Sequence, residues 1–345
     1  MEFSKVYKWV ISLFILLLIV FSGAYYGYYR LAKASNFNID GAESIRLNVY
    51  PGEDWHTVLE RVGGLTTIRY RGDLDKLATY GRTEPKFGSY LIAPNSTTLS
   101  LYRVISKGRE NPIRLRFNSV RTPDELYEVI GKQLMIGVDS VRLAMTDTVL
   151  LAQEGIGDSI FAYHAIPNTY EVYWSISSDK LVRRLCKESK SFWSEGRQEK
   201  ARAIGISPYE VSILASIVQE ESAKIDEYDD IAGLYLNRLR LGMPLQADPT
   251  VKYAVGDFTL KRILHVHLKT ESPYNTYLVT GLPPTPIRIP SIQAIDGVLN
   301  ATEHKFLYMC AKEDFSGYHN FAVSYDEHLA NAKRYTAALN ARGIR

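Results

Sequence analysis

Several common signatures of catalytic chemistry are scarce or missing in this chain of 345 residues. Its two cysteines, Cys186 and Cys310, have no metal-binding spacing around them, and whether they form a disulfide is left open by the sequence. His265 and His267 alternate as on a strand, but no third ligand has a spacing suitable for zinc. A Gly-x-Ser-x-Gly motif is absent, which argues against a serine hydrolase of that type. We therefore expect neither a metal nor a cofactor.

The chain also has little excess of one charge over the other. The formal net charge of +3 is too small to indicate nucleic acid as a partner. Hydrophobic residues make up 46% and charged residues 23% of the chain, which is typical of a globular protein. Tyrosine is abundant, with 24 residues. Because its ring stacks on sugars and its hydroxyl forms hydrogen bonds, this count slightly favours a glycan or peptide groove over an ordinary structural use.

A long apolar segment lies near the N-terminus. Residues 9–29 contain no charge and, as a helix, are long enough to cross a hydrocarbon core of about 30 Å. Aromatic residues gather at both ends of the segment, as at membrane interfaces. A cleaved signal peptide is the alternative, but the segment is long and lacks a clear small-x-small cleavage site. We expect a retained single-pass transmembrane helix with residues 1–8 as a cytoplasmic leader.

The remaining sequence mixes short strands with helices without a regular βαβ alternation, which predicts an α+β protein. Its expected elements are a strand at 47–50, helices at 55–62 and 73–80, a strand at 88–94, a helix at 100–106, a strand at 113–117, and helices starting at 122, covering 139–153 and 178–204, and ending near 241. The expected parts are a linker at 30–43, a small subdomain at 44–110, an α+β connecting lobe at 111–205 and a catalytic region at 206–345.

One helix in the last of these regions has clear start signals. Ser207 is a predicted N-cap, Pro208 suits the first helical position, and Glu210 completes a capping box. The apolar residues that follow recur at helical spacing and form one stripe, which indicates a buried face. They are Ile213, Leu214, Ile217 and Val218.

Glu221 places a carboxylate almost on the midline of this apolar stripe, whereas Glu220 lies about a quarter turn away, toward solvent. Burial disfavours the charged carboxylate, and so does the negative end of the helix dipole. Both effects raise the pKa of Glu221, and a carboxylic acid that is protonated near neutral pH suits general-acid catalysis. A buried structural glutamate paired with an arginine explains the same pattern equally well.

Gln246 and Asp248 lie in a short polar segment downstream. Asp248 precedes Pro249, which predicts an N-cap followed by proline at the first helical position. This structural role is favoured over a catalytic one for Asp248. Gln246 has no structural role visible in the sequence, so a hydrogen bond from its side chain to substrate is our hypothesis.

Residues 272–287 are rich in proline and glycine, which predicts a rigid extended loop rather than a helix or strand. The loop carries Tyr274, Asn275 and Tyr277, and rigid loops with such side chains are common in binding clefts. A structural crossover accounts for the prolines equally well, but less readily for the polar residues before them.

Several short blocks of sequence occur in the same order as in a known protein family, which the chain resembles. The blocks are 214–222 (LASIVQEES), 237–239 (NRL), 245–250 (LQADPT), 274–277 (YNTY), 281–284 (GLPP), 317–321 (GYHNF) and 327–328 (EH). Together they resemble the MltG-type endolytic murein transglycosylases, also called the YceG-like family, from about residue 44 to the C-terminus.

The resemblance implies cleavage of MurNAc-GlcNAc β-1,4 bonds in peptidoglycan strands without water, leaving 1,6-anhydroMurNAc ends and terminating nascent strands. It implies a single-pass protein of the inner (cytoplasmic) membrane, with its catalytic region on the periplasmic side and glycan-polymerising synthases as partners. It also implies a LysM-like subdomain, although the residues after Pro51-Gly52-Glu53 depart from the standard repeat. The implied catalytic residue is Glu221, and the implied substrate-binding residues are Gln246, Asp248, Tyr274, Asn275 and Tyr277.

Two alternatives stay open. A hydrolytic muramidase would need a second carboxylate in the cleft, and Asp248 is the candidate, although its predicted capping role argues against it. A non-catalytic, membrane-tethered glycan-binding scaffold would use Glu221 only as a buried structural charge. The transglycosylase is the preferred hypothesis because one carboxylate suffices when the C6 hydroxyl of the muramic acid is the nucleophile.

Overall fold

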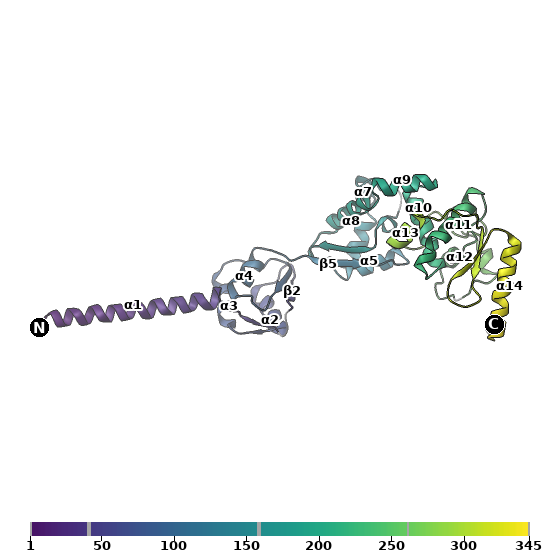
Figure 1. Cartoon of the computed structure of the whole chain (residues 1–345). Helices are drawn as coiled ribbons and strands as arrows, with labels where there is room; N and C mark the ends of the chain where they lie inside the picture. Colours follow the sequence, from purple (N-terminus) through teal and green to yellow (C-terminus); the bar gives the residue numbers. More distant parts are fainter. Residues whose placement is uncertain (1, 40–42, 157–159, 261, 344–345) are drawn as a thin grey trace. The chain divides into compact units, whose positions relative to one another are not determined.

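The computed structural model describes residues 2–39, 43–156, 160–260 and 262–343 (Figure 1). The protein mixes helices and strands, as expected, and its strands pair only in small two-stranded sheets. The chain divides into two compact units. The first comprises residues 1–114 and 170–176, and the second comprises residues 115–169 and 177–345.

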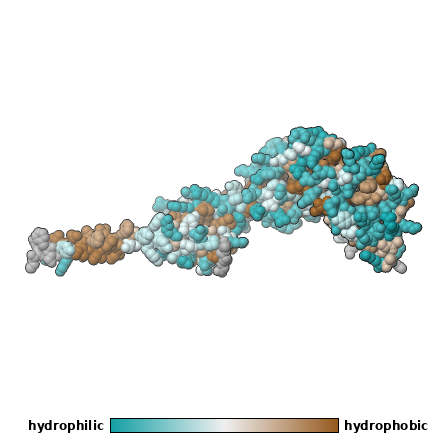
Figure 2. Space-filling view, in the orientation of Figure 1, coloured by the Kyte–Doolittle hydropathy of each residue, from teal (hydrophilic) through white to brown (hydrophobic). Residues whose placement is uncertain are grey.

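The N-terminal helix α1, Glu2–Ala32, is long and apolar enough to cross a membrane. Figure 2 shows an apolar stretch along the middle of this helix. The helix continues past residue 29, the predicted end of the membrane segment, and its last turn is bonded to the rest of the first unit. There Arg30 forms an ion pair with Asp73 at 2.8 Å and lies over the ring of Tyr70.

The first unit has a hydrophobic core of its own, to which its strands and helices contribute. Its elements after α1 are β1 (Phe37–Asn38), β2 (Ile45–Val49), α2 (Trp55–Leu65), β3 (Thr67–Ile68), α3 (Arg71–Tyr80), β4 (Gly88–Ile92) and α4 (Thr98–Ser106). Strands β2 and β4 pair antiparallel with Leu47 opposite Tyr90, and both of these side chains are fully buried. The order of the main elements is therefore strand, helix, helix, strand.

The expected linker at 30–43 is partly a structural element of this unit. Asn36 is fully buried, and its Nδ2 donates to the hydroxyl of Thr98 at 2.8 Å. Phe37 joins the hydrophobic core, and β1 pairs with β3. Residues 40–42 lie outside the described residues. The linker prediction fails at residues 35–38 because one buried amide and one aromatic ring are too few to leave a periodic signal in the sequence.

The next stretch of chain is mainly helical. Its elements are β5 (Ile113–Phe117), α5 (Pro123–Gly131), α6 (Gly137–Met145), α7 (Thr148–Gln153), a 3₁₀ turn (Phe161–His164), β6 (Asn168–Val172), α8 (Ser178–Phe192) and α9 (Glu195–Ile204). The two long helices expected here are each divided into two. Asp147 accepts hydrogen bonds from the amides of Val149 and Leu150, which caps a new helix and ends the preceding one.

The remaining elements carry the blocks of sequence described above. They are α10 (Pro208–Glu221), a 3₁₀ turn (Ile225–Glu227), α11 (Tyr228–Arg240), α12 (Asp248–Val255), a 3₁₀ turn (His267–Lys269), α13 (Ile292–Leu299), β7 (Tyr308–Ala311), β8 (His319–Ala322) and α14 (Tyr325–Ala341). The predicted capping box of Ser207 and Glu210 is confirmed at the start of α10. The strand expected around His265 and His267 is wrong, because His267 begins a 3₁₀ turn.

Helix α10 lies in the core of the second unit, where it packs against α11 and α13. Small residues allow the close approach of these helices. A Cβ atom added to Gly297 of α13 would lie 2.7 Å from the Cβ of Tyr228, at the start of α11. Glycine at this position therefore sets the distance between two helices that hold α10 in place.

We expect Gly297→Ala to lower the free energy of unfolding of the second unit by about 1–3 kcal/mol, because the added methyl overpacks the interface. Gly196→Ala is the matched control, since Gly196 lies in α9 with nothing within 4 Å of an added Cβ. Alanine there should be neutral or slightly stabilising. Denaturant unfolding of the full chain in detergent measures both. Equal effects of the two substitutions would contradict the close-packing argument.

Candidate active site

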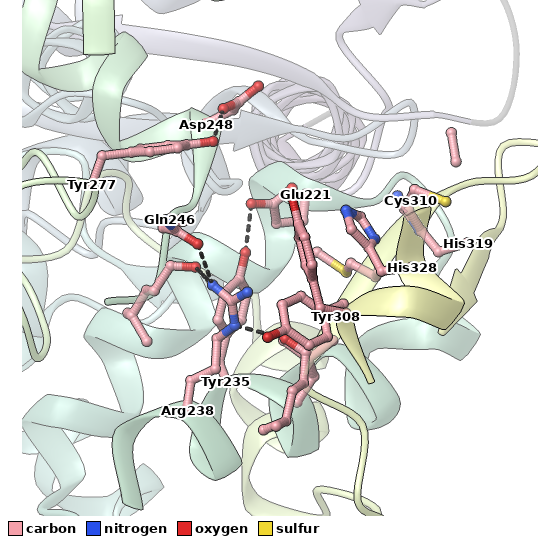
Figure 3. A pocket seen from close by; sticks show the side chains of 16 residues that line it. Glu221, Tyr235, Arg238, Gln246, Asp248, Tyr277, Tyr308, Cys310, His319 and His328 are labelled. Atoms are coloured by element: carbon pink, nitrogen blue, oxygen red, sulfur yellow. Dashed lines mark hydrogen bonds between the residues drawn. The ribbon is translucent and has the colours of Figure 1, made fainter. Parts of the chain in front are cut away.

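A cavity of about 360 Å³ opens at the C-terminal end of α10, and the carboxylate of Glu221 faces into it (Figure 3). Its walls come from α10, α11, the segment before α12, the proline-rich loop, β7, β8 and α14. The polar and aromatic side chains that line it are Glu221, Tyr235, Arg238, Gln246, Asp248, Tyr277, Tyr308, His319, Tyr325 and His328. The blocks that are separated in sequence therefore meet in one place.

Burial raises the pKa of Glu221 to about 7, and the negative charges of Asp248 and Glu220 act in the same direction. The hydroxyl of Tyr235 donates to Oε1 of Glu221 at 2.7 Å and partly opposes the shift by stabilising the carboxylate. No ion pair to Glu221 is found among the described residues. Near neutral pH its carboxyl group is thus both a proton donor and, once ionised, a proton acceptor.

Glu220 is the glutamate that pairs with arginine. Its carboxylate lies 2.6 Å from Arg288 and 3.2 Å from Arg121, and its side chain is only 15% exposed. The expectation that Glu220 faces solvent is wrong, because these two arginines cover that side of the helix end. The structural interpretation considered for Glu221, a buried glutamate held by arginine, applies instead to its neighbour.

The end of α10 is fixed to the loops around it by polar side chains on its buried side. The hydroxyl of Ser216 accepts the amide of Ile287 at 3.0 Å. Oε1 of Gln219 accepts the amide of Ser291 at 2.8 Å. The predicted extended loop at 272–287 contains no helix or strand and is held against α10 by the first of these bonds.

Gln246 has a left-handed backbone, with φ of 53°, which is uncommon for a residue other than glycine. Its amide donates to the carbonyl of Thr276 at 3.0 Å, and its Oε1 accepts from Arg238 at 3.2 Å. The surrounding bonds therefore hold Gln246 in a strained conformation with its side chain at the cavity, where the sequence hypothesis placed it.

Asp248 is not the predicted N-cap. Helix α12 begins at Asp248 itself, the cap position is Ala247, and no side-chain capping bond is present there. Just before the helix, the Ala247 amide donates to the hydroxyl of Thr276 at 3.0 Å. The carboxylate of Asp248 is exposed at the cavity and accepts the hydroxyl of Tyr277 at 2.7 Å. The argument that capping occupies this carboxylate therefore fails.

The three residues expected from the loop take different places. Tyr277 lines the cavity. Asn275 is fully buried, and its Nδ2 donates to the carbonyls of Leu268 and Thr270 at 2.9 and 2.8 Å. The hydroxyl of Tyr274 bonds to that of Thr285 at 2.8 Å, away from the residues that line the cavity. Asn275 and Tyr274 thus shape the loop that presents Tyr277.

Arg238 is a cavity residue to which the sequence analysis assigned no role. Its side chain is 6% exposed and donates to the carbonyls of Leu307 at 2.7 Å, Leu245 at 2.8 Å and Pro244 at 3.0 Å. Among the described residues no carboxylate forms an ion pair with it. Its place in the block at 237–239 was the signal available in the sequence.

Tyr308, His319 and His328 form the wall opposite the proline-rich loop. The rings of Tyr308 and His328 stack with centroids 5.4 Å apart. Burial and the charge of Arg238 lower the pKa of His328, and its Nδ1 is buried without a hydrogen-bond partner in the described part of the chain. Nδ1 of His319 lies 3.0 Å from the carboxylate of Glu227. The two histidines belong to the blocks at 317–321 and 327–328, whereas Tyr308 gave no signal in the sequence.

The two cysteines do not form a disulfide in the structure. Cys186 and Cys310 are both free thiols, the first buried and the second at the cavity. Within the described ranges, no group of three or more His, Cys, Asp or Glu side chains is arranged to hold a metal ion. The functional groups at the cavity are carboxyl, guanidinium, imidazole, phenol, amide and thiol groups.

Comparison with known proteins gives a consistent result. The chain is 31% identical over 166 residues to an endolytic murein transglycosylase of Bacillus subtilis, a match that covers 48% of this chain and 45% of that protein. It is 25% identical over 377 aligned residues to the protein of the same name from Streptococcus pneumoniae strain D39, covering 98% of this chain and 67% of the relative. The matches thus span about half to two thirds of these relatives.

The fold is also similar to the crystal structure of a YceG-like protein from Listeria monocytogenes. The TM-score is 0.56 at 21% sequence identity, and the match covers 84% of this chain and 99% of the other. The model of the YceG-like family matches residues 47–334, which include every side chain of the cavity. The chain therefore belongs to the YceG-like family.

Proposed function

We propose that this chain is a membrane-anchored endolytic lytic transglycosylase of peptidoglycan. The observation that carries the proposal is the state of Glu221: a carboxyl group that faces a cavity, bonded to one phenol, with its pKa raised to about 7. The names of the relatives support the same activity. The bond cleaved is the MurNAc-GlcNAc β-1,4 bond, and the products end in 1,6-anhydroMurNAc.

The proposed mechanism uses Glu221 twice. Its protonated form gives a proton to the glycosidic oxygen as the bond to the anomeric carbon breaks. The resulting carboxylate then takes the proton from the C6 hydroxyl of the same muramic acid while that oxygen bonds to the anomeric carbon. Tyr235 holds Oε1, which leaves the other carboxyl oxygen for the substrate. A pKa near neutrality suits both proton transfers.

The polar groups of the cavity supply substrate binding in this proposal. Gln246, Asp248 and Tyr277 contact the glycan and stabilise the positive charge that develops on the sugar ring. Tyr274 and Asn275 act indirectly, by fixing the loop that carries Tyr277. The bond between Tyr277 and Asp248 joins two walls of the cavity and keeps both groups oriented.

The N-terminal unit indicates where in the cell envelope the enzyme acts. We propose that α1 is a single-pass anchor in the inner (cytoplasmic) membrane, with the catalytic unit on the periplasmic or extracytoplasmic side. The strand-helix-helix-strand order of β2, α2, α3 and β4 supports a LysM-like subdomain. An enzyme of this kind terminates nascent strands, and its partners are the synthases that polymerise them.

A hydrolytic muramidase is the second candidate, and one observation favours it. Asp248 has an exposed carboxylate in the same cavity as Glu221, and it caps no helix. A second carboxylate of this kind can activate a water molecule or act as a nucleophile. Its hydrogen bond from Tyr277 occupies one oxygen only.

Product analysis separates the two candidates. We expect the full chain in detergent to convert purified glycan strands into fragments whose sugar ends are anhydro, because the C6 hydroxyl displaces the leaving group. Mass spectrometry of the fragments measures this. Reducing ends heavier by one water, in place of anhydro ends, would assign the reaction to a muramidase that uses Asp248.

Glu221→Gln should lower the rate of strand cleavage by about 10²–10⁴-fold, since an amide cannot donate the proton. Strand binding and the unfolding transition should persist. Glu220→Gln is the comparison: it keeps the acid in place but removes the carboxylate that pairs with Arg288 and that helps to raise the pKa of Glu221, so cleavage should persist with its decline moved to lower pH. A glycan-binding scaffold predicts no difference in product formation between the Glu221→Gln chain and the unaltered one.

The rate should depend on pH through Glu221. The acid form is lost as pH rises through about 7, so kcat/KM should fall above that pH. Tyr235→Phe removes a hydrogen bond that stabilises the carboxylate, so the pKa rises and the decline should move to higher pH. A pH-rate profile of both proteins measures the shift. A decline that stays in place or moves to lower pH would contradict the assignment of the acid.

A further inference from the structure

One backbone edge of strand β7 borders the cavity. Five consecutive residues, 307–311, line the cavity. Because successive side chains of a strand point to opposite faces, one face alone would contribute only every second residue. An uninterrupted run therefore means that the backbone edge of β7 borders the same space as Glu221.

The register of the β7–β8 pair shows which backbone groups this edge presents. The amide of Lys312 donates to the carbonyl of Tyr318 at 2.8 Å, just beyond the paired strands. Hydrogen-bonded and non-hydrogen-bonded pairs alternate along an antiparallel ladder. Met309 and Ala311 consequently belong to non-hydrogen-bonded pairs, and their N–H and C=O groups point away from β8.

His319 supports this assignment independently. It lies opposite Ala311, and its amide donates to Oε1 of Glu227 at 2.7 Å rather than to β7. Apart from the β7–β8 ladder, the described residues provide no hydrogen bond to the backbone of Met309 or Ala311. The edge toward the cavity thus offers two donors and two acceptors.

We propose that this edge binds the peptide carried by the muramic acid, as a short added β-strand. The inference rests on the proposed function and names a further part of its substrate. Alternate residues of β7 are about 7 Å apart, the interval at which an extended peptide presents its own N–H and C=O groups. Consecutive sugars of a β-1,4-linked strand face opposite sides, so N-acetyl groups on one side recur only at every second sugar, which is a longer interval than that of the edge. The amide groups of a peptide therefore match this edge better than those of the glycan.

The position of the edge suits this occupant. The peptide is attached to the sugar whose bond is cleaved, so it lies beside Glu221 when that bond is in place. Arg238 donates to the carbonyl of Leu307 at the start of β7 and has no carboxylate partner among the described residues. Its charge complements the carboxylates of an acidic peptide. The side chain of Met309 packs on the core, which leaves recognition to the backbone.

The test compares strands that keep their peptides with strands from which an amidase has removed them. The Glu221→Gln chain in detergent permits binding to be measured without cleavage. We expect peptide-bearing strands to bind about tenfold more tightly, as a few net hydrogen bonds imply. Equal dissociation constants for the two kinds of strand would overturn the proposal.

Ala311→Pro, added to this chain, removes one outward N–H. Proline is tolerated at the edge of a sheet where its missing N–H faces outward. The ratio of the two dissociation constants should fall toward one. Ala311→Ser, which keeps the N–H, is the matched control and should retain the ratio. A ratio that is unaffected by proline in a chain with an unchanged unfolding transition would overturn the proposal.

Hydrogen exchange provides a measurement that does not depend on the folding of the proline variant. Peptide-bearing strands should slow amide exchange in residues 307–312 of the Glu221→Gln chain, and peptide-free strands should not. Protection by both kinds of strand would assign the edge to the glycan, and protection by self-association without strands would assign it to a second copy of the chain. Either result overturns the proposal.

The proposed function is tested separately, by the cleavage of peptide-free strands by the unaltered chain. If these strands are cleaved to anhydro ends while the binding ratio is one, the edge proposal fails and the transglycosylase stands. If peptide-bearing strands bind more tightly but neither kind of strand is cleaved, the activity fails and the binding edge stands.

Discussion

The chemistry of this cavity depends on where the arginines find their partners. Arg121 and Arg288 are paired with Glu220, outside the cavity, and Arg238 is bonded to backbone carbonyls. Glu221 is left with a phenol as its hydrogen-bond partner. If one of these guanidinium groups formed an ion pair with Glu221 instead, the pKa of the acid would fall and it would be ionised at neutral pH. The protonation state of Glu221 therefore depends on the arginines pairing with its neighbour Glu220 and not with Glu221 itself.

This pairing requires that the end of α10 be held accurately. Helices α11 and α13 pack on α10, with Gly297 at the close contact between α13 and the start of α11. Ser216 and Gln219 bond α10 to the loop and to the start of α13. On the other wall, the hydroxyls of Thr250 and Thr276 bond at 2.8 Å and tie α12 to the proline-rich loop. Rigid elements thus carry the groups around the carboxyl of Glu221, and β7 closes the cavity with a free backbone edge.

Individual residues show how far sequence reasoning reaches at such a site. The helix of Glu221 and its capping box were predictable because start signals and helical period are local properties. Asp248 was misassigned because the motif of aspartate before proline is typical of a cap, while the helix begins at Asp248 itself and its carboxylate accepts the hydroxyl of Tyr277, distant in sequence. Asn275 was assigned to the cleft on its polarity, yet its amide holds the turn of its own loop. Short-range sequence patterns do not show which of several possible hydrogen-bond partners a side chain takes in the folded protein.

The sequence by itself determined that an apolar helix precedes an α+β protein, that one carboxylate interrupts a buried helical stripe, and that ordered blocks match the YceG-like family. These are properties of neighbouring residues and of their order. Tertiary structure alone decided that Glu220 pairs with the arginines, that Tyr235 and Tyr308 join the cavity, and that β7 turns its edge toward it. Each of these depends on contacts between segments far apart in the chain, for which neither helical period nor local motif carries a signal.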